Sequence, residues 1–300
     1  MKSLGSWPGL SRDFEQLLEA ELNPGKMAGY PVWEAARYSL LGGGKRVRPR
    51  LLVAACELAA SPPRAALPFA AALEMIHTYS LIHDDLPAMD DDDFRRGQAS
   101  CHKAFGEATA ILAGDLLLNR ACELMIRVCL ENPEGPCLKA MGILMEASGG
   151  VGMILGQDRD LALERSPEKE VELADVLWMA ELKTSRLIRA ALLMGGWLAD
   201  LDQEVLDLLG TMGTSLGLAF QIKDDILDCV SSRDTLGKTP LKDQGAGKKT
   251  FVTLAGLESA RTLLDEKENQ VLRILDQLEA KGLKTGPLAG LVAYLTERNY

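Results

Sequence analysis

An all-α fold is predicted by two features of the sequence. Apolar residues recur at three- and four-residue spacing along nearly every long segment, whereas no alternation typical of a strand continues for long. Clusters of proline and glycine fall between these segments, where helices end. No change of composition and no repeat marks a boundary, so we expect one domain over residues 1–300. Helices are predicted at residues 11–22, 31–42, 47–60, 66–90, 107–131, 136–153, 170–199, 203–230, 250–281 and 285–297.

Local signals support these helix ends. Asn23-Pro24-Gly25 and Ser61-Pro62-Pro63 interrupt the periodic pattern, because proline removes a backbone donor and glycine favours turns. Pro87 is expected to kink or end the fourth helix near its carboxylates. Ser166-Pro167-Glu168 is typical of a helix start, with a capping oxygen, a first-turn proline and an acidic residue at the positive pole.

Composition restricts the class of protein. The chain is 47% hydrophobic and 25% charged, which is typical of a globular protein. Its formal net charge of −10 argues against a nucleic-acid partner. The six cysteines show neither a C-x-x-C pair nor zinc-finger spacing, so we expect reduced thiols in a cytoplasmic protein. The N-terminus lacks the apolar region of a signal peptide, and no stable membrane insertion is expected, since no run approaches the roughly 20 apolar residues of a span.

An acidic stretch, Leu81–Gly97, carries the strongest chemical signal. Six carboxylates lie within ten residues, after an apolar segment and just before Arg95-Arg96. Such a cluster repels itself unless water or a cation neutralises it, and Mg²⁺ prefers carboxylate oxygens. The neighbouring arginines could bind phosphate in a bidentate manner. The alternative is a solvated acidic helix end. The six residues are Asp84, Asp85, Asp90, Asp91, Asp92 and Asp93.

A basic segment and a histidine precede this stretch. The sequence GGGKRVRPR at 42–50 is not a Walker phosphate loop, because the first glycine and the final Ser or Thr of that motif are missing. Its side chains Lys45, Arg46, Arg48 and Arg50 could still surround a diphosphate, or could form a basic surface. His77 lies seven residues before Asp84, on the same helical face, where it is either a substrate contact or a core residue.

A second acidic motif occurs at FQIKDDILD, residues 220–228. Gln221, Asp224, Asp225 and Asp228 form one polar stripe on a helix with apolar flanks, and such a stripe needs partners or a metal. Lys183-Thr184 lies within another apolar helix, where a lysine is more often a snorkelling side chain. The segment GMILGQDRDL at 152–161 shows no distinct chemistry.

A loop rich in glycine and lysine follows the second acidic motif, at residues 231–249. It contains Lys238, Lys242, Lys248 and Lys249. A basic loop beside an acidic metal site is interpreted as a lid that closes on phosphates, and the alternative is a plain linker.

Taken together, these motifs resemble the trans-prenyltransferases, the short-chain isoprenyl diphosphate synthases. The resemblance rests on DDLPAMD at 84–90 with Arg95-Arg96, DDILD at 224–228, GGKRVRP at 43–49, Lys183-Thr184, and LGKT with a later GKKT. It implies about ten or more antiparallel helices around a deep central cavity, a homodimer, and several Mg²⁺ ions per active site. It also implies isopentenyl diphosphate and an allylic diphosphate, dimethylallyl or geranyl, as substrates.

The resemblance also assigns roles to individual residues. Asp84, Asp90 and Asp224 would hold the Mg²⁺ ions, supported by Asp85 and Asp228. The allylic diphosphate would contact Arg95, Lys183, Lys238 and Lys248, and isopentenyl diphosphate would contact Lys45, Arg48, His77 and Arg96. Oxygens of Lys183, Thr184 and Gln221 would lie near the allylic carbocation. The proton would leave to the departed pyrophosphate, so that no protein base is required.

Product length is predicted from Tyr79, which lies five residues before Asp84, about 7.5 Å along a helix. In this family a bulky residue there closes the cavity floor, and with the expanded D-D-x-x-x-x-D motif it resembles bacterial-type farnesyl diphosphate synthases. Geranylgeranyl or geranyl diphosphate is the alternative product, and ordinary core packing is the alternative role of Tyr79. Ser185 stands where the family usually has glycine, and Pro240-Leu241-Lys242 is an uncommon lid sequence.

Three other functions compete with this interpretation. A terpene cyclase shares metal-assisted ionisation, but it has no need of a second diphosphate site and carries a different second metal motif. A non-catalytic partner subunit tends to lose an aspartate motif, and here both motifs are complete. A calcium-binding protein is disfavoured because the chain lacks an EF-hand loop.

Overall fold

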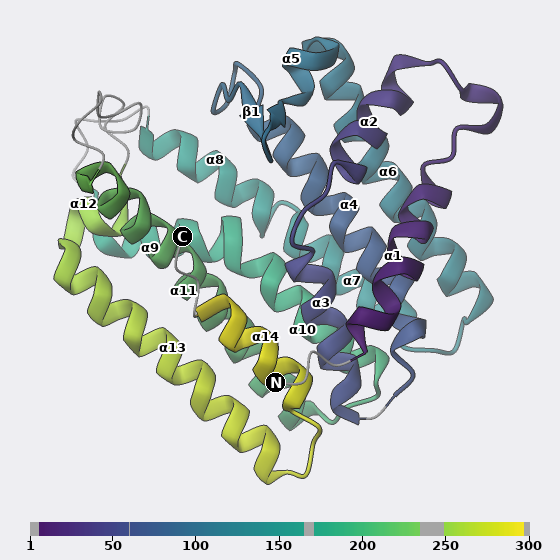
Figure 1. The fold of residues 1–300 in the computed structure, drawn as a ribbon. Coiled ribbons are helices and arrows are strands. Elements are labelled where there is room, and N and C mark those ends of the chain that lie inside the picture. The colour runs from purple at the N-terminus through teal and green to yellow at the C-terminus, as the bar shows by residue number, and fades with distance from the viewer. Residues whose placement is uncertain (1–5, 60, 165–170, 235–248, 297–300) are drawn as a thin grey trace. The chain divides into compact units, whose positions relative to one another are not determined.

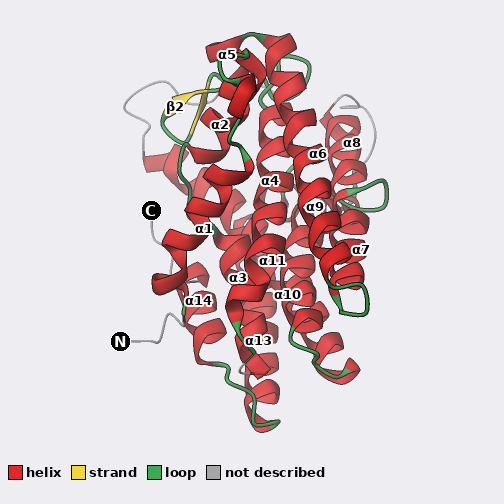
Figure 2. Ribbon diagram, turned by 90° about the vertical axis from the view of Figure 1, so that its right-hand side faces the viewer, coloured by secondary structure: helices red, strands yellow, loops and turns green. Residues whose placement is uncertain are grey.

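The described part of the chain is almost entirely helical, which confirms the predicted all-α class. The computed structural model describes residues 6–59, 61–164, 171–234 and 249–296. Figures 1 and 2 show helices throughout, with one two-stranded hairpin. Contacts divide the chain into two compact units, an N-terminal unit (residues 4–142 and 194–200) and a C-terminal unit (residues 1–3, 143–193 and 201–300). The prediction that the whole chain is one domain stays a prediction.

The N-terminal unit contains the first acidic motif and the basic segment. Its elements are α1 (Trp7–Glu21), η1 (Gly25–Met27), α2 (Pro31–Leu41), α3 (Val47–Cys56), η2 (Glu57–Ala59), η3 (Pro63–Ala66), α4 (Leu67–Asp84), β1 (Phe94–Arg95), β2 (Gln98–Ala99), α5 (Cys101–Phe105) and α6 (Glu107–Glu131). The first half of α7 (Cys137–Ser148) and the end of α10 (Arg186–Leu198) also belong to this unit.

Helix α4 forms the centre of the N-terminal unit. It packs on α6 and α3 and is buried on most of its circumference, as expected for a helix that is apolar on all sides. Pro68 lies in its first turn, where the missing backbone donor costs nothing. Helix α4 therefore holds Glu74, His77 and Tyr79 in fixed positions, and Asp84 lies at its end.

A hairpin that the periodicity did not predict follows the first acidic motif. Phe94 pairs with Ala99 and Arg95 with Gln98. Arg96 and Gly97 form the two-residue turn, both with positive φ (54° and 78°), as in a type I′ turn. Two-residue strands are too short to show an alternating pattern, which is why the sequence did not reveal them.

The C-terminal unit contains the second acidic motif. Its elements are the rest of α7, α8 (Met153–Glu164), α9 (Leu173–Ala180), η4 (Glu181–Ser185), the first part of α10, α11 (Gln203–Asp234), α12 (Phe251–Ala255), α13 (Leu257–Ala280) and α14 (Gly286–Thr296). Helix α11 runs beside α13 (Figure 1) and also packs on η4, a π-helical turn that separates α9 from α10. Phe251 and Ile222 are fully buried in the core between these helices.

Several predicted helix boundaries were wrong. The helix predicted at 66–90 ends at Asp84. The helix predicted at 250–281 is broken at Gly256, which has a φ of 80°. The pattern at 136–153 contains α7 only up to Ser148, and the helix α8 that follows it was not predicted. Apolar spacing alone does not mark these breaks, which depend on local backbone conformation such as the positive φ of Gly256.

In the part of the chain that the structure describes, three helices are long and apolar enough to cross a membrane by length and composition, contrary to the expectation from the sequence. They are Pro63–Asp84, Cys137–Glu164 and Gln203–Val230. In the first and third, 72% and 67% of the apolar window is buried inside the protein, so that most of this surface forms core.

Candidate active site

The first acidic motif folds into a compact loop at the end of α4. The backbone N–H of Asp90 donates to the carbonyl of Asp84 over 2.8 Å, and the N–H of Asp91 donates to Leu86 over 3.2 Å. Asp91 takes a left-handed conformation with φ 48°. The residues of the expanded motif therefore loop out and bring the main chains of Asp84 and Asp90 together.

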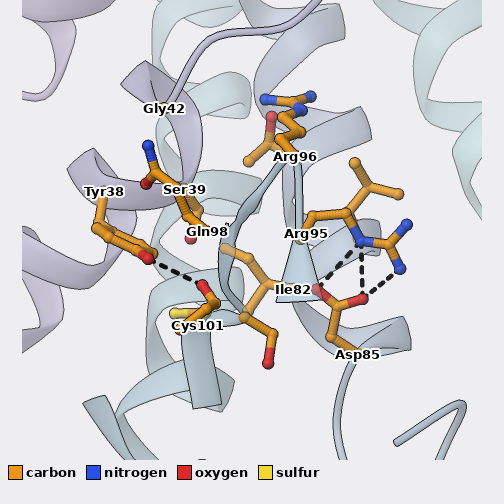
Figure 3. Close-up of a pocket in the computed structure, with 13 residues that line it drawn as sticks. Tyr38, Ser39, Gly42, Ile82, Asp85, Arg95, Arg96, Gln98 and Cys101 are labelled. Carbon is orange, nitrogen blue, oxygen red and sulfur yellow. Dashed lines mark hydrogen bonds and ion pairs between the residues drawn. The ribbon is translucent and has the colours of Figure 1, made fainter. Parts of the chain in front are cut away.

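Asp85 and Arg95, predicted respectively as a metal-site residue and a phosphate contact, bind one another in the structure. Nε of Arg95 donates to both carboxylate oxygens of Asp85 over 2.9 and 3.3 Å, and Nη2 also donates to Asp85 (Figure 3). Nη2 donates to Asp92 as well, over 3.1 Å. Burial raises the pKa of Asp85, and the hydrogen bonds and charge of Arg95 oppose that rise. The buried carboxylate of Asp85 thus fixes the direction of the Arg95 guanidinium.

The predicted basic cradle is only partly available to a substrate. Arg46 is 5% exposed, and it donates to Glu74 and to Glu15 (2.9 Å each) and to the carbonyl of Leu40. The suggestion that Arg46 surrounds a diphosphate was therefore wrong, because its donors are already used inside the N-terminal unit. Lys45, which precedes it, is exposed.

Arg48, His77 and Arg96 lie in one electrostatic cluster. Nη1 of Arg48 donates to Nε2 of His77 over 3.1 Å, because a guanidinium has no acceptor. Burial and the charges of Arg48 and Arg96 lower the pKa of His77 well below its ordinary value of 6.5. The imidazole is therefore neutral near pH 7, with its proton on Nδ1. Three of the four residues predicted for isopentenyl diphosphate are thereby brought together.

Lys183 lies in the π-helical turn η4 and is paired with a carboxylate that the sequence did not reveal. Its Nζ donates to Oδ2 of Asp160 over 2.6 Å, and Asp160 is 5% exposed. A Cβ on Gly156 would collide with the backbone of Lys183, so that glycine permits α8 to approach the turn. Asp160 belongs to the segment 152–161, for which the sequence indicated no distinct chemistry. The one available signal was its spacing of four residues from Gly156, which places both residues on the same side of α8.

The polar stripe on α11 contacts the same π-helical turn, η4. Oγ1 of Thr184 donates to Oε1 of Gln221 over 3.0 Å, and Nε2 of Gln221 donates to Asp225 over 3.2 Å. Asp225 in turn accepts the backbone N–H of Phe251 at the start of α12. Three of the predicted residues, Lys183, Thr184 and Gln221, therefore lie on neighbouring elements of one unit, and Asp225 has a structural partner.

Asp224 lines a separate hollow in the C-terminal unit, between α11 and the residues Glu268 and Thr296. Lys223 beside it donates to the carbonyl of Thr296 at the end of α14. Asp228 lies one helical turn after Asp224 and is exposed. Lys238 and Lys248, both predicted contacts of the allylic diphosphate, lie outside the described residues, as does most of the predicted lid.

Tyr79 is buried in the N-terminal unit, with 6% of its surface exposed. Its ring packs edge-on against His83, with centroids 5.8 Å apart. Burial raises its pKa to about 12, and the charges of Asp84 and Cys122 add to the rise. Within the described residues its hydroxyl finds no hydrogen-bond partner, which is unusual for a buried tyrosine. The floor role of Tyr79 remains a prediction.

The acidic side chains fit magnesium. Among the residues that the structure describes, no group of three carboxylates, histidines or cysteines could hold a metal ion alone. Mg²⁺ is usually bound through one or two carboxylates, with substrate phosphates and water completing its octahedron. The main chains of Asp84 and Asp90 are joined by a hydrogen bond, and Asp224 and Asp228 lie one helical turn apart, so that each pair could supply two carboxylates to such an ion.

Similarity to known proteins identifies the class to which this chain belongs. A family model described as "Polyprenyl synthetase" matches residues 31–283, and the chain belongs to that family. The resemblance read from the motifs is therefore confirmed.

The chain is similar to several named enzymes and solved structures. The chain is 42% identical to the farnesyl diphosphate synthase of Micrococcus luteus over 293 residues, covering 97% of each protein. It is also 42% identical to a chloroplastic geranylgeranyl pyrophosphate synthase 9 of Arabidopsis thaliana, covering 89% of this chain and 74% of that protein. The structure of a geranyltransferase from Helicobacter pylori, complexed with magnesium and isoprenyl diphosphate, is similar with a TM-score of 0.84, 33% identity and 97% coverage of each chain.

The neutral state of His77 predicts how stability depends on pH. A folded-state pKa below 6.5 means that only the unfolded chain takes up this proton as the pH falls, so folding loses stability in that window. Between about pH 7.5 and about pH 5.5, the wild type should lose on the order of 1 kcal/mol more than His77→Gln, which cannot titrate. Urea unfolding of both proteins at each pH measures the difference. Parallel stability curves would show that His77 titrates normally.

Proposed function

We propose that the protein condenses isopentenyl diphosphate head-to-tail with dimethylallyl or geranyl diphosphate, giving mainly farnesyl diphosphate and releasing diphosphate. The observation that carries the proposal is the end of α4, where Asp84 and Asp90 lie together while Asp85 holds Arg95. Carboxylates that bind a divalent cation and a guanidinium held in a fixed direction are what recognition of a diphosphate requires. The relatives named for such reactions support the substrate class.

Each part of the site has a task in this reaction. When bound, Mg²⁺ neutralises the negative charge that develops on the leaving diphosphate. Asp84, Asp90, Asp224 and Asp228 are the residues that would hold it. Arg95, Lys183 and, in the proposal, Lys238 and Lys248 add positive charge where negative charge grows. Thr184 holds the amide oxygen of Gln221 by a 3.0 Å hydrogen bond, and we assign the oxygens of these two side chains to stabilising the electron-poor allylic carbon.

The second substrate needs its own anion site. Arg48 and Arg96 lie close together with neutral His77, and Lys45 is exposed at the same turn. We assign these four residues to the diphosphate of isopentenyl diphosphate. The Nε2 lone pair of His77 already accepts a hydrogen bond from Arg48, so this imidazole is not available as a general base. This agrees with loss of the proton to the released pyrophosphate.

A product assay tests the activity. Purified protein with geranyl diphosphate, isopentenyl diphosphate and Mg²⁺ should give mainly the C15 product, and excess EDTA should abolish turnover. Cyclic hydrocarbon products would favour a cyclase. Activity that appears only with a catalytic homologue would favour a partner subunit.

Product length has a separate test at Tyr79. Truncation of this buried ring opens space five residues below Asp84, so Tyr79→Ala should shift the main product from C15 to C20 or longer. Tyr79→Phe is the matched control, because it keeps the ring and removes only the unpartnered hydroxyl; it should keep the C15 product. A C20 majority in the wild type would support the geranylgeranyl alternative, which the Arabidopsis relative keeps open.

We also propose that the protein is a homodimer in the cytoplasm. One face of α6 and the start of α7 carry large exposed apolar side chains: Ile111, Leu112, Ile126, Leu130 and Leu138, 45–76% exposed. A patch of this kind marks an interaction surface, and six cysteines that form no disulfide suit a reducing compartment. The double substitution Ile126→Glu with Leu130→Glu should yield a 32.5 kDa monomer in sedimentation. A wild type that already sediments as a monomer would refute the dimer, and activity confined to membrane fractions would refute the location.

A further inference from the structure

Glu74 is a buried carboxylate among arginines that come from other elements. It lies on α4, three residues before His77, and its side chain is 3% exposed. Its Oε1 accepts Nη1 of Arg46 over 2.9 Å and lies 3.8 Å from Nη2 of Arg96. A carboxylate removed from water is strongly unfavourable unless cations surround it. The surrounding arginines therefore stabilise the buried negative charge of Glu74.

The charged forms of the arginines around Glu74 are also disfavoured by burial, and its negative charge stabilises them. Burial lowers the pKa of Arg48 to about 10, with the charge of Glu74 opposing this effect and that of Arg96 adding to it. Burial also lowers the pKa of Arg96, again against the charge of Glu74. Guanidinium groups that are partly removed from water and close together repel one another. The buried carboxylate is the negative charge that these arginines share.

The backbone around the cluster leaves Arg96 little freedom. Arg96 takes a left-handed conformation in the hairpin turn and donates from Nη1 to the carbonyl of Gly43. A Cβ at Gly44 would lie 3.0 Å from Cζ of Arg96, so the guanidinium lies flat on the glycine turn. With Glu74 on another side, the Arg96 guanidinium is held by the turn and the carboxylate together.

Arg46 has a different part in the cluster. Its Nε and Nη2 donate to Glu15, and Nη2 also donates to the carbonyl of Leu40, so that its donors are all directed inward. It therefore anchors Glu74 rather than a substrate. Arg95 is held elsewhere, by Asp85 and Asp92.

We propose that Glu74 is a positioning residue for isopentenyl diphosphate, which orients Arg96 before that substrate binds. The inference rests on the proposed function and adds a residue that does not itself touch substrate. A cation cluster already ordered in the free enzyme spares the substrate the cost of ordering it. Because Arg95 depends on other carboxylates, the effect is confined to one of the two diphosphates.

The test separates the two substrates. Glu74→Gln keeps the size and one acceptor for Arg46 but removes the charge, and it should raise the KM for isopentenyl diphosphate by about 10-fold to 100-fold. The KM for geranyl diphosphate should change by less than about threefold, since Arg95 keeps its partners. Glu74→Asp, which retains the charge, should recover part of the loss. The matched control is Glu15→Gln, which also touches Arg46 but is 44% exposed and should leave both KM values unchanged.

Several results would overturn the role of Glu74. These are an unchanged KM for isopentenyl diphosphate in folded Glu74→Gln, an equal rise of both KM values, or a Glu74→Asp variant no better than Glu74→Gln. If Glu74→Gln does not fold, Glu74→Asp carries the same test, and loss of folding in both variants would assign Glu74 to stability alone. Wild-type turnover in the same assay separates the two hypotheses, because an inactive wild type counts against the proposed function instead.

Discussion

Pairing of charges away from water is the constraint on which the candidate site residues of each unit depend. Arg95 is bound by Asp85, Lys183 by Asp160 and Arg46 by Glu74, and in each pair the carboxylate is nearly fully buried. A buried charge without its partner costs several kcal/mol. Each cation is therefore fixed by a carboxylate within its own unit, and the directions of Arg95 and Lys183 are set without a bound substrate.

Close backbone contacts set the shape in which these pairs are held. Glycine at 156 and at 217 allows α8 and α11 to press against the π-helical turn that carries Lys183, because a Cβ at either position would collide with that turn. The turn also places Ser185, whose hydroxyl has no partner among the described residues, directly against Gly217. A π-helical turn inside a helix is costly and occurs mostly at functional sites, and here tight packing on two sides maintains it.

Sequence patterns predicted which residues share one helix, but they missed contacts between residues on different elements. Helical periodicity and motif spacing placed Gln221 with Asp225 and the carboxylates at the end of α4. The partners of Arg46 and Lys183 were missed, because Glu74 is 28 residues and Asp160 is 23 residues away in the chain. The helix boundary at Asp84 was also misjudged, since the chain turns out of the helix three residues before Pro87 and six before Asp90. Spacing gives neighbours on a helix, whereas counter-charges depend on how helices pack.

Neighbouring aspartates of one motif consequently have different tasks. Asp84 and Asp85 differ by one position on α4, about 100° around the helix axis. Asp85 is thereby directed into the protein, where Arg95 binds it, while the chain beyond loops back so that Asp90 meets Asp84. An expanded motif needs this return, because an uninterrupted helix would carry Asp90 about 9 Å farther along the axis. The extra residues therefore bring the main chain of Asp90 back to Asp84, while the side chain of Asp85 binds Arg95.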